Sequence, residues 1–440
     1  MKYAKQIFMA AIVGLTVLLQ ACTSGGSSGP ATGTLSGKVT TGSPATAVAN
    51  VSVIIFDAST NAPVNSTMST DINGDYSATL TVGSYYVKLY KQGYNPVPAS
   101  ALQTAVPLTI TGGATTTNNV AMTASTVSNG GWITGTVSNS AGGLGGVLVA
   151  AEATGVAYTS ISDSSGNYSI FNVPAASYTV KAYISGYSST APAATVTAST
   201  ATTTNLTVTA NATGTVPVSF NLISATGVTP PANMVVSLVH PVTKETIPGF
   251  TLSQAYAPSL SYSFSNVADG SYIVRATFAN DTIVVDPDAI VKFGEPSVTV
   301  ASATPSPNPV AIKATSAVGL TNPTNALGST VPVLVSGTTP TFTWVAYPST
   351  SDYVIEVMDA STGAVIWGGF SGTGTSTTKN ITIPSSQTSI VYNSNGLATV
   401  PLVVGKTYRW RIYASKNQVA VPGWGLISMS EDQMGLITIQ

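Results

Sequence analysis

The sequence predicts an all-β protein made of tandem antiparallel β-sandwich domains behind an N-terminal signal peptide. Three observations lead to this fold class. Short runs of β-branched and aromatic residues alternate in hydrophobicity, Gly-, Asn- and Asp-containing turns separate them, and one pattern of turns and strands recurs along the chain. Charged residues make up only 7% of the 440 residues, far below the roughly one quarter of an average soluble domain.

The first 21 residues have the pattern of an export signal. Lys2 and Lys5 form a positively charged end, and Ile7–Leu19 is an apolar run that is short for a membrane span. Leu19-Gln-Ala-Cys22 follows, and it contains the only cysteine of the chain. This stretch resembles the bacterial lipobox, which implies cleavage before Cys22 and attachment of diacylglycerol and palmitate to that residue. The alternative is an ordinary cleaved signal with an unrelated cysteine nearby.

Lipid attachment at Cys22 would make the membrane a partner of the mature chain, since two or more acyl chains suffice for stable anchoring. Thr23, rather than an aspartate, follows the cysteine. By resemblance to the enterobacterial sorting rule, this residue implies the outer membrane, with the protein on its periplasmic or its cell-surface face. Residues 22–32 are rich in Gly and Ser and are expected to form a flexible tether.

The first sandwich is expected at residues 33–126. Asp71–Tyr76 is predicted to form a turn whose Asp and Asn side chains accept hydrogen bonds from the backbone. A strand over Tyr85–Tyr90 follows, and its alternation assigns one face to the core and the other to water. The side chains expected in the core are Tyr85, Val87 and Leu89. The side chains expected to face water are Tyr86, Lys88 and Tyr90.

A second sandwich is expected at residues 127–212, because the same motifs return there. Tyr168 follows Tyr76 by 92 residues, and Tyr178 follows Tyr85 by 93. Such a period is the size of one small sandwich domain. A third, degenerate sandwich is predicted at residues 213–315, where Tyr272 follows Tyr178 by 94 residues but the Asp-x-x-Gly-x-Tyr turn is missing.

The last 125 residues, 316–440, follow a different pattern and are predicted to form a fourth β domain. In the stretch 402–412, Tyr408, Trp410 and Ile412 are expected to point into the core, while Arg409 and Arg411 alternate outward.

Two family resemblances follow from these motifs. The first and second repeats resemble carboxypeptidase regulatory-like domains, which are prealbumin-like sandwiches grouped with carbohydrate-binding-like folds. The resemblance implies the fold and carries no catalytic residues. Residues 316–440 resemble a fibronectin type III domain, with Trp344 as the core tryptophan and Tyr408 as the tyrosine that bonds the backbone at the sheet corner. The residues behind the first resemblance are Gly37, Val51, Val53, Asp71, Gly74, Tyr76, Tyr85, Gly93 and Tyr94, with their counterparts Gly135, Val147, Val149, Asp163, Gly166, Tyr168, Tyr178, Gly186 and Tyr187.

Three outward-facing tyrosines are the candidate ligand-binding residues: Tyr86, Tyr90 and Tyr183. Flat rings on an exposed sheet can stack on sugars, whereas packing between neighbouring domains is the alternative role of such residues.

Acidic turns are weak candidates for calcium, and we predict no metal site and no cofactor. Asp71, Asn73 and Asp75 place oxygens at alternating positions, but the terminal glutamate of a calcium loop is missing, which favours a plain Asx turn. The acidic group Asp281, Asp286 and Asp288 is interpreted as a solvated edge between strand and loop.

Catalysis and nucleic-acid binding are not expected. The single histidine, His240, follows a predicted strand and is interpreted as a surface loop residue, and the three arginines form no basic stripe. The sequence therefore favours a non-catalytic lipoprotein of the cell envelope that acts as an adhesion, spacer or ligand-binding scaffold. Two alternatives stay open: a stack of carbohydrate-binding modules that attaches to polysaccharide, and an accessory subunit of a surface enzyme or export complex, with other envelope proteins as partners.

Overall fold

The computed structural model confirms the predicted fold class, because the described part of the chain consists almost entirely of antiparallel and mixed β-sheets. It describes residues 30–42, 44–98, 107–127, 129–224, 233–255, 261–278, 282–301, 310–326, 331–360, 363–432 and 434–440. Below, repeat 1, repeat 2, repeat 3 and terminal module denote residues 33–126, 127–212, 213–315 and 316–440.

Repeat 1 forms two sheets. The first contains β1 (Thr32–Thr41), β2 (Thr46–Ala47), β4 (Asp75–Thr81), β7 (Thr115–Thr117) and β8 (Val120–Ala121). The second has the order β3 (Ser52–Asp57), β5 (Gly83–Tyr90) and β6 (Leu108–Ile110).

Repeat 2 has the same arrangement with additional edge strands. Its first sheet contains β9 (Gly131–Asn139), β10 (Gly142–Gly143), β13 (Asn167–Val173), β15 (Ser188–Ser189), β17 (Ala201–Thr203) and β18 (Leu206–Thr209). Its second has the order β12 (Val156–Ile161), β11 (Leu148–Ala153), β14 (Ser177–Tyr183) and β16 (Ala193–Thr195).

Repeat 3 shares this topology although its turn motif is lost. One sheet has the order β22 (Ser261–Val267), β19 (Gly214–Ser224), β26 (Val310–Ser316) and β24 (Ile283–Val285). The other has the order β21 (Thr246–Ala255), β20 (Asn233–Val239), β23 (Gly270–Phe278) and β25 (Ser297–Val300). In all three repeats the opening strand pairs in parallel with the closing strands, as β1 with β7 and β8, β9 with β17 and β18, and β19 with β26.

The terminal module is built around a larger sheet. That sheet contains β28 (Val333–Val335), β38 (Leu436–Ile439), β36 (Thr407–Asn417), β30 (Asp352–Asp359), β31 (Val365–Gly368), β34 (Ile383–Pro384) and β37 (Trp424–Met429). A facing sheet contains β27 (Leu320–Asn322), β29 (Thr341–Trp344) and β35 (Ser389–Val391). A hairpin of β32 (Phe370–Ser371) and β33 (Thr378–Lys379) encloses the 3₁₀ turn η1 (Gly374–Ser376).

The predicted alternation of the terminal strand is confirmed on its inner face. Tyr408, Trp410 and Ile412 are buried in one cluster with Trp344. The Val403 N–H donates a hydrogen bond of 2.9 Å to the Tyr408 hydroxyl oxygen, which ties the strand to the preceding loop. The resemblance to fibronectin type III domains stays a prediction.

A tyrosine at the start of one core strand fixes the same corner in each repeat. The hydroxyls of Tyr85, Tyr178 and Tyr272 donate to the backbone carbonyl four residues earlier, at 3.0, 3.0 and 2.8 Å. All three rings are buried, so each hydroxyl needs a partner inside the protein. The shared hydrogen bond explains why this tyrosine recurs even in the degenerate third repeat.

A glycine in each opening strand of the first two repeats has a steric cause. A Cβ atom on Gly37 would lie 2.0 Å from the Asn118 carbonyl oxygen, and one on Gly135 would lie 1.9 Å from the Thr204 carbonyl oxygen. Tyr168 extends across this position, and its hydroxyl donates to the same Thr204 oxygen at 2.6 Å. Only glycine leaves room for the closing segment beside the opening strand.

The Gly135→Ala substitution is therefore expected to destabilise repeat 2 by about 2 to 3 kcal/mol, because backbone atoms must move to admit the methyl group. Gly319→Ala is the matched control, since its Cβ would meet Val345 at an ordinary 3.5 Å. Denaturant unfolding of both variants tests this expectation. Equal stability of the two would contradict the close approach.

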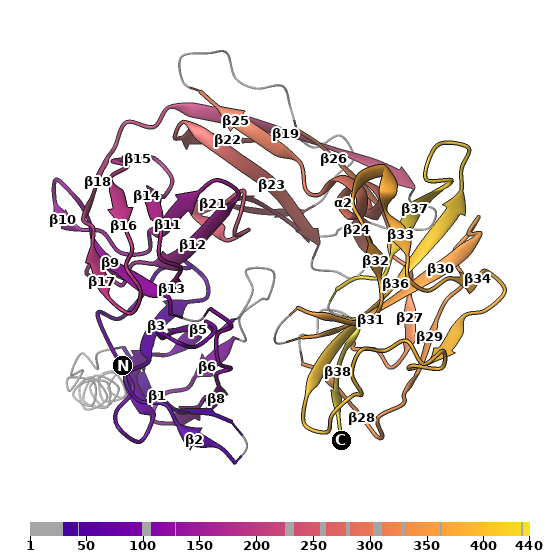
Figure 1. The fold of residues 1–440 in the computed structure, drawn as a ribbon, viewed down its shortest axis with the longest axis horizontal. Coiled ribbons are helices and arrows are strands. Elements are labelled where there is room, and N and C mark those ends of the chain that lie inside the picture. The colour runs from indigo at the N-terminus through magenta and orange to yellow at the C-terminus, as the bar shows by residue number, and fades with distance from the viewer. Residues whose placement is uncertain are drawn as a thin grey trace, which may run out of the picture.

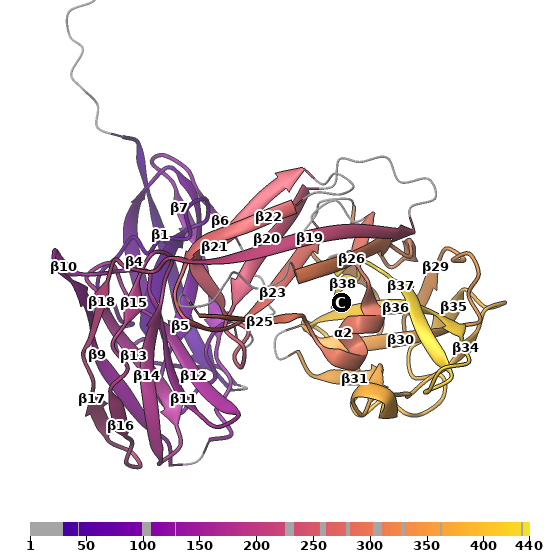
Figure 2. The same cartoon turned by 90° about the horizontal axis from the view of Figure 1, so that it is seen from above.

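The repeats and the terminal module follow one another along an arch (Figure 1). Repeat 1 lies at one foot in indigo, repeat 3 lies at the top, and the terminal module forms the other foot in orange and yellow. Seen from above, repeats 1 and 2 lie against each other at one end, and the terminal module lies at the opposite end (Figure 2).

Candidate functional site at the junction of the repeats

The outer face of repeat 1 is covered by its neighbours, so the prediction that it faces water is wrong for Tyr90, which is buried. Tyr86 is partly buried, and its ring stacks on Phe56 with centroids 5.0 Å apart. These rings belong to one apolar cluster that also contains Leu148 and Ile161 of repeat 2 and much of the repeat 3 core. The predicted core face is confirmed, because Tyr85, Val87 and Leu89 are all buried.

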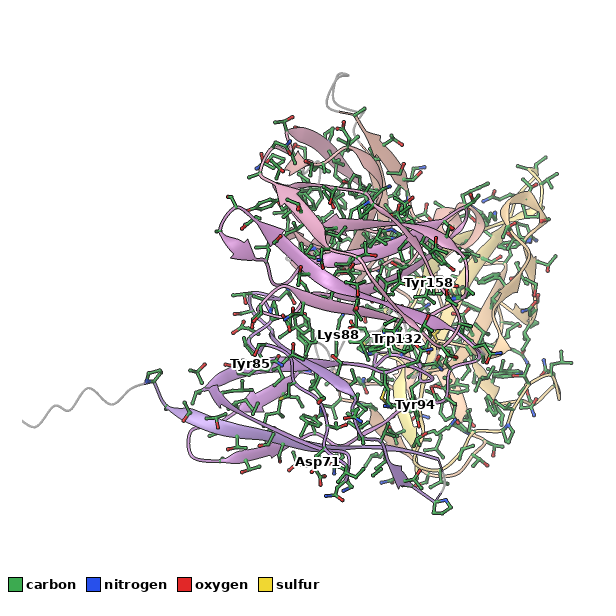
Figure 3. The ribbon with its side chains drawn as sticks, turned by 60° about the vertical axis from the view of Figure 1, so that its left-hand side comes forward. Asp71, Tyr85, Lys88, Tyr94, Trp132 and Tyr158 are labelled. Atoms are coloured by element: carbon green, nitrogen blue, oxygen red, sulfur yellow. The ribbon has the colours of Figure 1, made fainter. Side chains whose placement is uncertain are left out.

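An ion pair joins repeat 1 directly to repeat 3. Lys88 on β5 donates a hydrogen bond of 3.1 Å to a carboxylate oxygen of Glu245. Burial opposes the charge of Lys88, but Glu245 outweighs it and raises the pKa of the ammonium group. In Figure 3, Lys88 lies on the side of repeat 1 toward its neighbours, whereas Asp71 lies at the far side. All three repeats therefore meet at this point, which we call the junction.

The boundary between repeats 1 and 2 is held by hydrogen bonds around Asn172. Its side-chain oxygen accepts from the Gly93 N–H at 2.7 Å, and its amide donates to the Tyr94 carbonyl at 2.7 Å. Its own backbone N–H donates to the Gln92 side chain at 2.8 Å. Asn172 is buried and has a φ of 56°, a conformation that asparagine adopts more readily than most residues. The Gly93-Tyr94 motif thus contributes to contact between repeats.

His240 is buried, with 1% of its surface exposed, so the surface-loop interpretation is wrong. It follows β20 of repeat 3, and its Nε2 lies 3.0 Å from a carboxylate oxygen of Glu152 on β11 of repeat 2. Tyr183 donates to the same oxygen, and Lys181 donates to the other at 2.9 Å. Four polar side chains from two repeats therefore form one network at their interface.

The partners of His240 determine its tautomer. Backbone N–H groups of Val242 and Thr243 point at Nδ1 from 3.3 and 3.2 Å, so Nδ1 accepts hydrogen bonds and the Nε2–H donates one to the Glu152 carboxylate. Both nitrogens of the ring are thus engaged within the protein. General-base chemistry would require one of them to face a substrate.

Hydrogen bonding keeps Glu152 ionised. Burial alone would raise the pKa of this carboxyl group, but donation from His240, Tyr183 and Lys181 together outweighs burial and lowers the pKa to about 2. The pKa of Tyr183 is raised, first by burial and then by the carboxylate beside it. The network is therefore an anionic carboxylate among donors at neutral pH.

Acid is expected to weaken the interface between repeats 2 and 3. The folded pKa of Glu152 lies below its ordinary value of 4.5, so its contribution to stability is complete above pH 4.5 and is lost as the pH falls toward 2. The contribution is at most about 3 kcal/mol. Amide exchange of β11 and β20 at pH 6 and pH 3 measures it, with Glu152→Gln as a control that cannot titrate. A difference between the two proteins that does not shrink with falling pH would contradict the expectation.

The network lines a pocket between repeats 2 and 3 with a volume of about 690 Å³. Tyr183, a candidate binding residue, lies in its wall. The structure does not bring the three candidate tyrosines into one site, because Tyr86 and Tyr90 lie on the packed face of repeat 1. The structure places those two rings in the packing between repeats, which is the alternative role of these residues. Sequence reasoning missed Glu152 and Lys181. They lie on the neighbouring strands β11 and β14, and they come together in the pocket lining only when the sheet has formed.

The acidic turn of repeat 1 is an Asx turn in the structure. One carboxylate oxygen of Asp71 accepts from the backbone N–H groups of Asn73 and Asp75, both at 2.8 Å. Asp75 also pairs with Lys38 at 3.2 Å. Within the described ranges, no group of three or more His, Cys, Asp or Glu side chains is placed to hold a metal ion. Cys22, the candidate lipidation residue, lies outside the described residues.

Repeat 3 and the terminal module meet through a helix that the sequence analysis did not predict, α2 (Pro287–Phe293). Asp286, interpreted as a strand-loop edge residue, caps its N-terminus, and burial raises the pKa of its carboxyl group. Asp288 accepts from the Leu426 N–H at 2.7 Å. Lys292 donates to the Trp424 carbonyl at 2.8 Å and lies 4.6 Å from the Trp424 ring centre. Asp281 lies outside the described residues.

The chain is similar, at low sequence identity, to several solved structures. The chain is similar to the Bacillus anthracis TIE protein, with 12% identity over 65% of this chain and 51% of that chain and a TM-score of 0.18. It thus spans about half of that protein. It is also similar to a streptococcal ancillary pilin, with 11% identity over 65% of this chain and 99% of that chain and a TM-score of 0.20. The major pilin subunit of Bacillus cereus gives 12% identity, 64% and 99% coverage and a TM-score of 0.18. We draw nothing about function from similarity at this level.

A family comparison is more specific for one repeat. No curated protein matches the chain. Residues 132–219 match the family model described as carboxypeptidase regulatory-like domain, a range that covers most of repeat 2 and the start of β19. The resemblance inferred from Gly135, Tyr168 and Tyr178 is thus supported for this part of the chain, and repeat 2 is similar to a carboxypeptidase regulatory-like domain.

Proposed function

We propose that the chain is a non-catalytic scaffold of the bacterial cell envelope, anchored by lipid at Cys22 and used for adhesion or spacing. The observation that carries this proposal is the junction. The three repeats share an apolar cluster and the Lys88–Glu245 ion pair at their interface. They would therefore move as one rigid body, not as independent domains joined by flexible linkers. A rigid body attached at one end by a short tether can hold a distant surface at a fixed spacing from the membrane.

The N-terminal motif supports a location at the cell envelope. Cleavage before Cys22 would leave a tether of about ten residues before β1 begins at Thr32. In the part of the chain that the structure describes, no helix is long and apolar enough to span a membrane. In this proposal attachment depends on the lipid at Cys22, and Thr23 favours the outer membrane.

The Cys22→Ala substitution is expected to release the protein from the membrane fraction, because no acyl chain can then be attached. Fractionation of cells that express each form measures this, and Ser24→Ala is the matched control that keeps the cysteine. Thr23→Asp is expected to move the protein to the inner membrane in an enterobacterial host. Protease treatment of intact cells then distinguishes the cell surface from the periplasm. Unchanged membrane retention of Cys22→Ala would rule out the lipid anchor.

A further inference from the structure

The pocket between repeats 2 and 3 has the build of a ligand site. Its volume of about 690 Å³ lies within the range of small-molecule sites in proteins. Both repeats supply its walls, with β11 and β14 on one side and the segments around His240 and Asp269 on the other. Such positions between domains are common places for ligands.

The buried lining of the pocket combines apolar side chains with the His240–Glu152 network, and its exposed lining mixes polar and apolar side chains. Ile247, Phe250 and Tyr272 in its lining are buried side chains of repeat 3. Asn211 and Ser271 are exposed lining residues. A ligand that enters would therefore meet aromatic and aliphatic carbon beside the His240–Glu152 network. At the rim it would meet amide and hydroxyl groups together with Val156 and Val242.

The charges of the pocket select against ionic ligands. Both oxygens of Glu152 already accept hydrogen bonds, one from His240 and Tyr183 and the other from Lys181. An ammonium group at Glu152 would compete with Lys181 for the carboxylate. An anion would meet two carboxylates, Glu152 and Asp269, against the one ammonium group of Lys181, so the lining carries a net charge of −1. A neutral ligand with many hydroxyl groups meets neither penalty.

Hydroxyl recognition has suitable partners here. The Lys181 ammonium group has three N–H donors, of which one reaches Glu152. Ser188 and Ser189 in the lining already donate their hydroxyl protons, to the Asn211 side-chain oxygen and to the Thr190 carbonyl, so their oxygens can serve a ligand as acceptors. Tyr187, a partly buried lining residue, offers a ring against which the C–H face of a sugar can pack.

We propose that this pocket binds a neutral saccharide of one to a few rings. Because such a ligand would contact both repeats, binding would also stabilise their interface in proportion to the logarithm of ligand concentration. The ligand site and the scaffold role are independent, since either could hold without the other.

The test uses the full mature chain with Cys22→Ala for solubility and an array of mono- to tetrasaccharides that includes neutral sugars, uronic acids and amino sugars. Saturation-transfer NMR on the array hits then gives affinities. We expect at least one neutral sugar to bind. Tyr187→Ala should weaken that binding at least tenfold, and Asn211→Lys, which places a long charged side chain at the mouth, should abolish it.

Asn73→Lys is the matched control, since Asn73 is an exposed asparagine of repeat 1 outside the pocket, and this variant should bind as the parent does. Three results would overturn the proposal: no sugar binds, only charged sugars bind, or a neutral sugar binds Tyr187→Ala and Asn211→Lys as well as the parent. Amide exchange of β14 in each variant checks that repeat 2 stays folded. Loss of lipid anchoring in the Cys22→Ala parent has no bearing on any of these results.

Discussion

Replacing Phe56 with alanine is expected to lower the free energy of unfolding at the junction by about 3 to 5 kcal/mol, the range for truncating a buried phenylalanine. Phe56 lies on β3, but its side chain belongs to the cluster shared by the repeats and not to the core of repeat 1. Its loss should therefore reduce amide protection in β5, β11 and β20 together.

Phe293→Ala is the matched control for this measurement. Phe293 ends α2 and is 71% exposed, so its truncation should change stability by less than about 0.5 kcal/mol. If Phe56→Ala behaved like Phe293→Ala, or loosened repeat 1 alone, the repeats would not share a core.

Replacing Lys88 with alanine is the second large effect. The Lys88 and Glu245 side chains are 15% and 24% exposed, and removing one partner of such a partly buried pair leaves the other charge without compensation, which destabilises by up to roughly 3 kcal/mol. Glu245 would then be left without its cation. It lies 157 residues from Lys88 in the sequence, on the repeat 3 side of the interface. Chemical denaturation with amide exchange of β5 and β21 measures the loss.

Two further variants separate charge from packing. Lys38→Ala removes a pair whose side chains are 44% and 51% exposed, and it should change stability by less than about 1 kcal/mol. The double variant Lys88→Met with Glu245→Leu should recover most of the loss, because an apolar pair of similar size has no charge to bury. Equal effects of Lys88→Ala and Lys38→Ala would show that repeat 3 does not bury the Lys88 pair.

The sequence was a good guide to features that depend on local order. Alternation correctly predicted the inner faces of β5 and β36, since side chains on successive strand positions point to opposite sides whatever the rest of the protein does. The Asx turn at Asp71 was predicted for the same reason, because its hydrogen bonds span only four residues. Recurring tyrosines also indicated repeat 3 although its turn motif is lost.

Features formed between repeats could not be predicted in this way. Tyr86, Lys88 and Tyr90 form a face of mixed polarity, and such a face is equally compatible with solvent and with an interface that pairs its charges. His240 is interpreted from the sequence as a surface loop residue because it is a polar residue that directly follows a predicted strand. Its partner Glu152 lies 88 residues earlier, and nothing local in the sequence relates the two.

Helix α2 was missed although its signals were present. Asp286 precedes Pro287, Pro287 is at the first turn, and Gly294 follows Phe293, which together are the start and stop pattern of a short helix. The helix has only seven residues and lies among predicted strands, so its start and stop residues were not recognised. Asp286 and Asp288 were interpreted as part of one acidic group, whereas Asp286 caps the helix and Asp288 pairs with Lys292.

The shared junction is tested most directly by a distance measurement between repeats 1 and 3. Spin labels attached through cysteines at Asn73 and Thr299, both exposed, in the Cys22→Ala background report the distance by pulsed electron resonance. One narrow distance distribution that broadens in Lys88→Ala is the result we predict. A broad or multi-peaked distribution in the parent protein would show that the repeats move independently and would contradict the rigid scaffold.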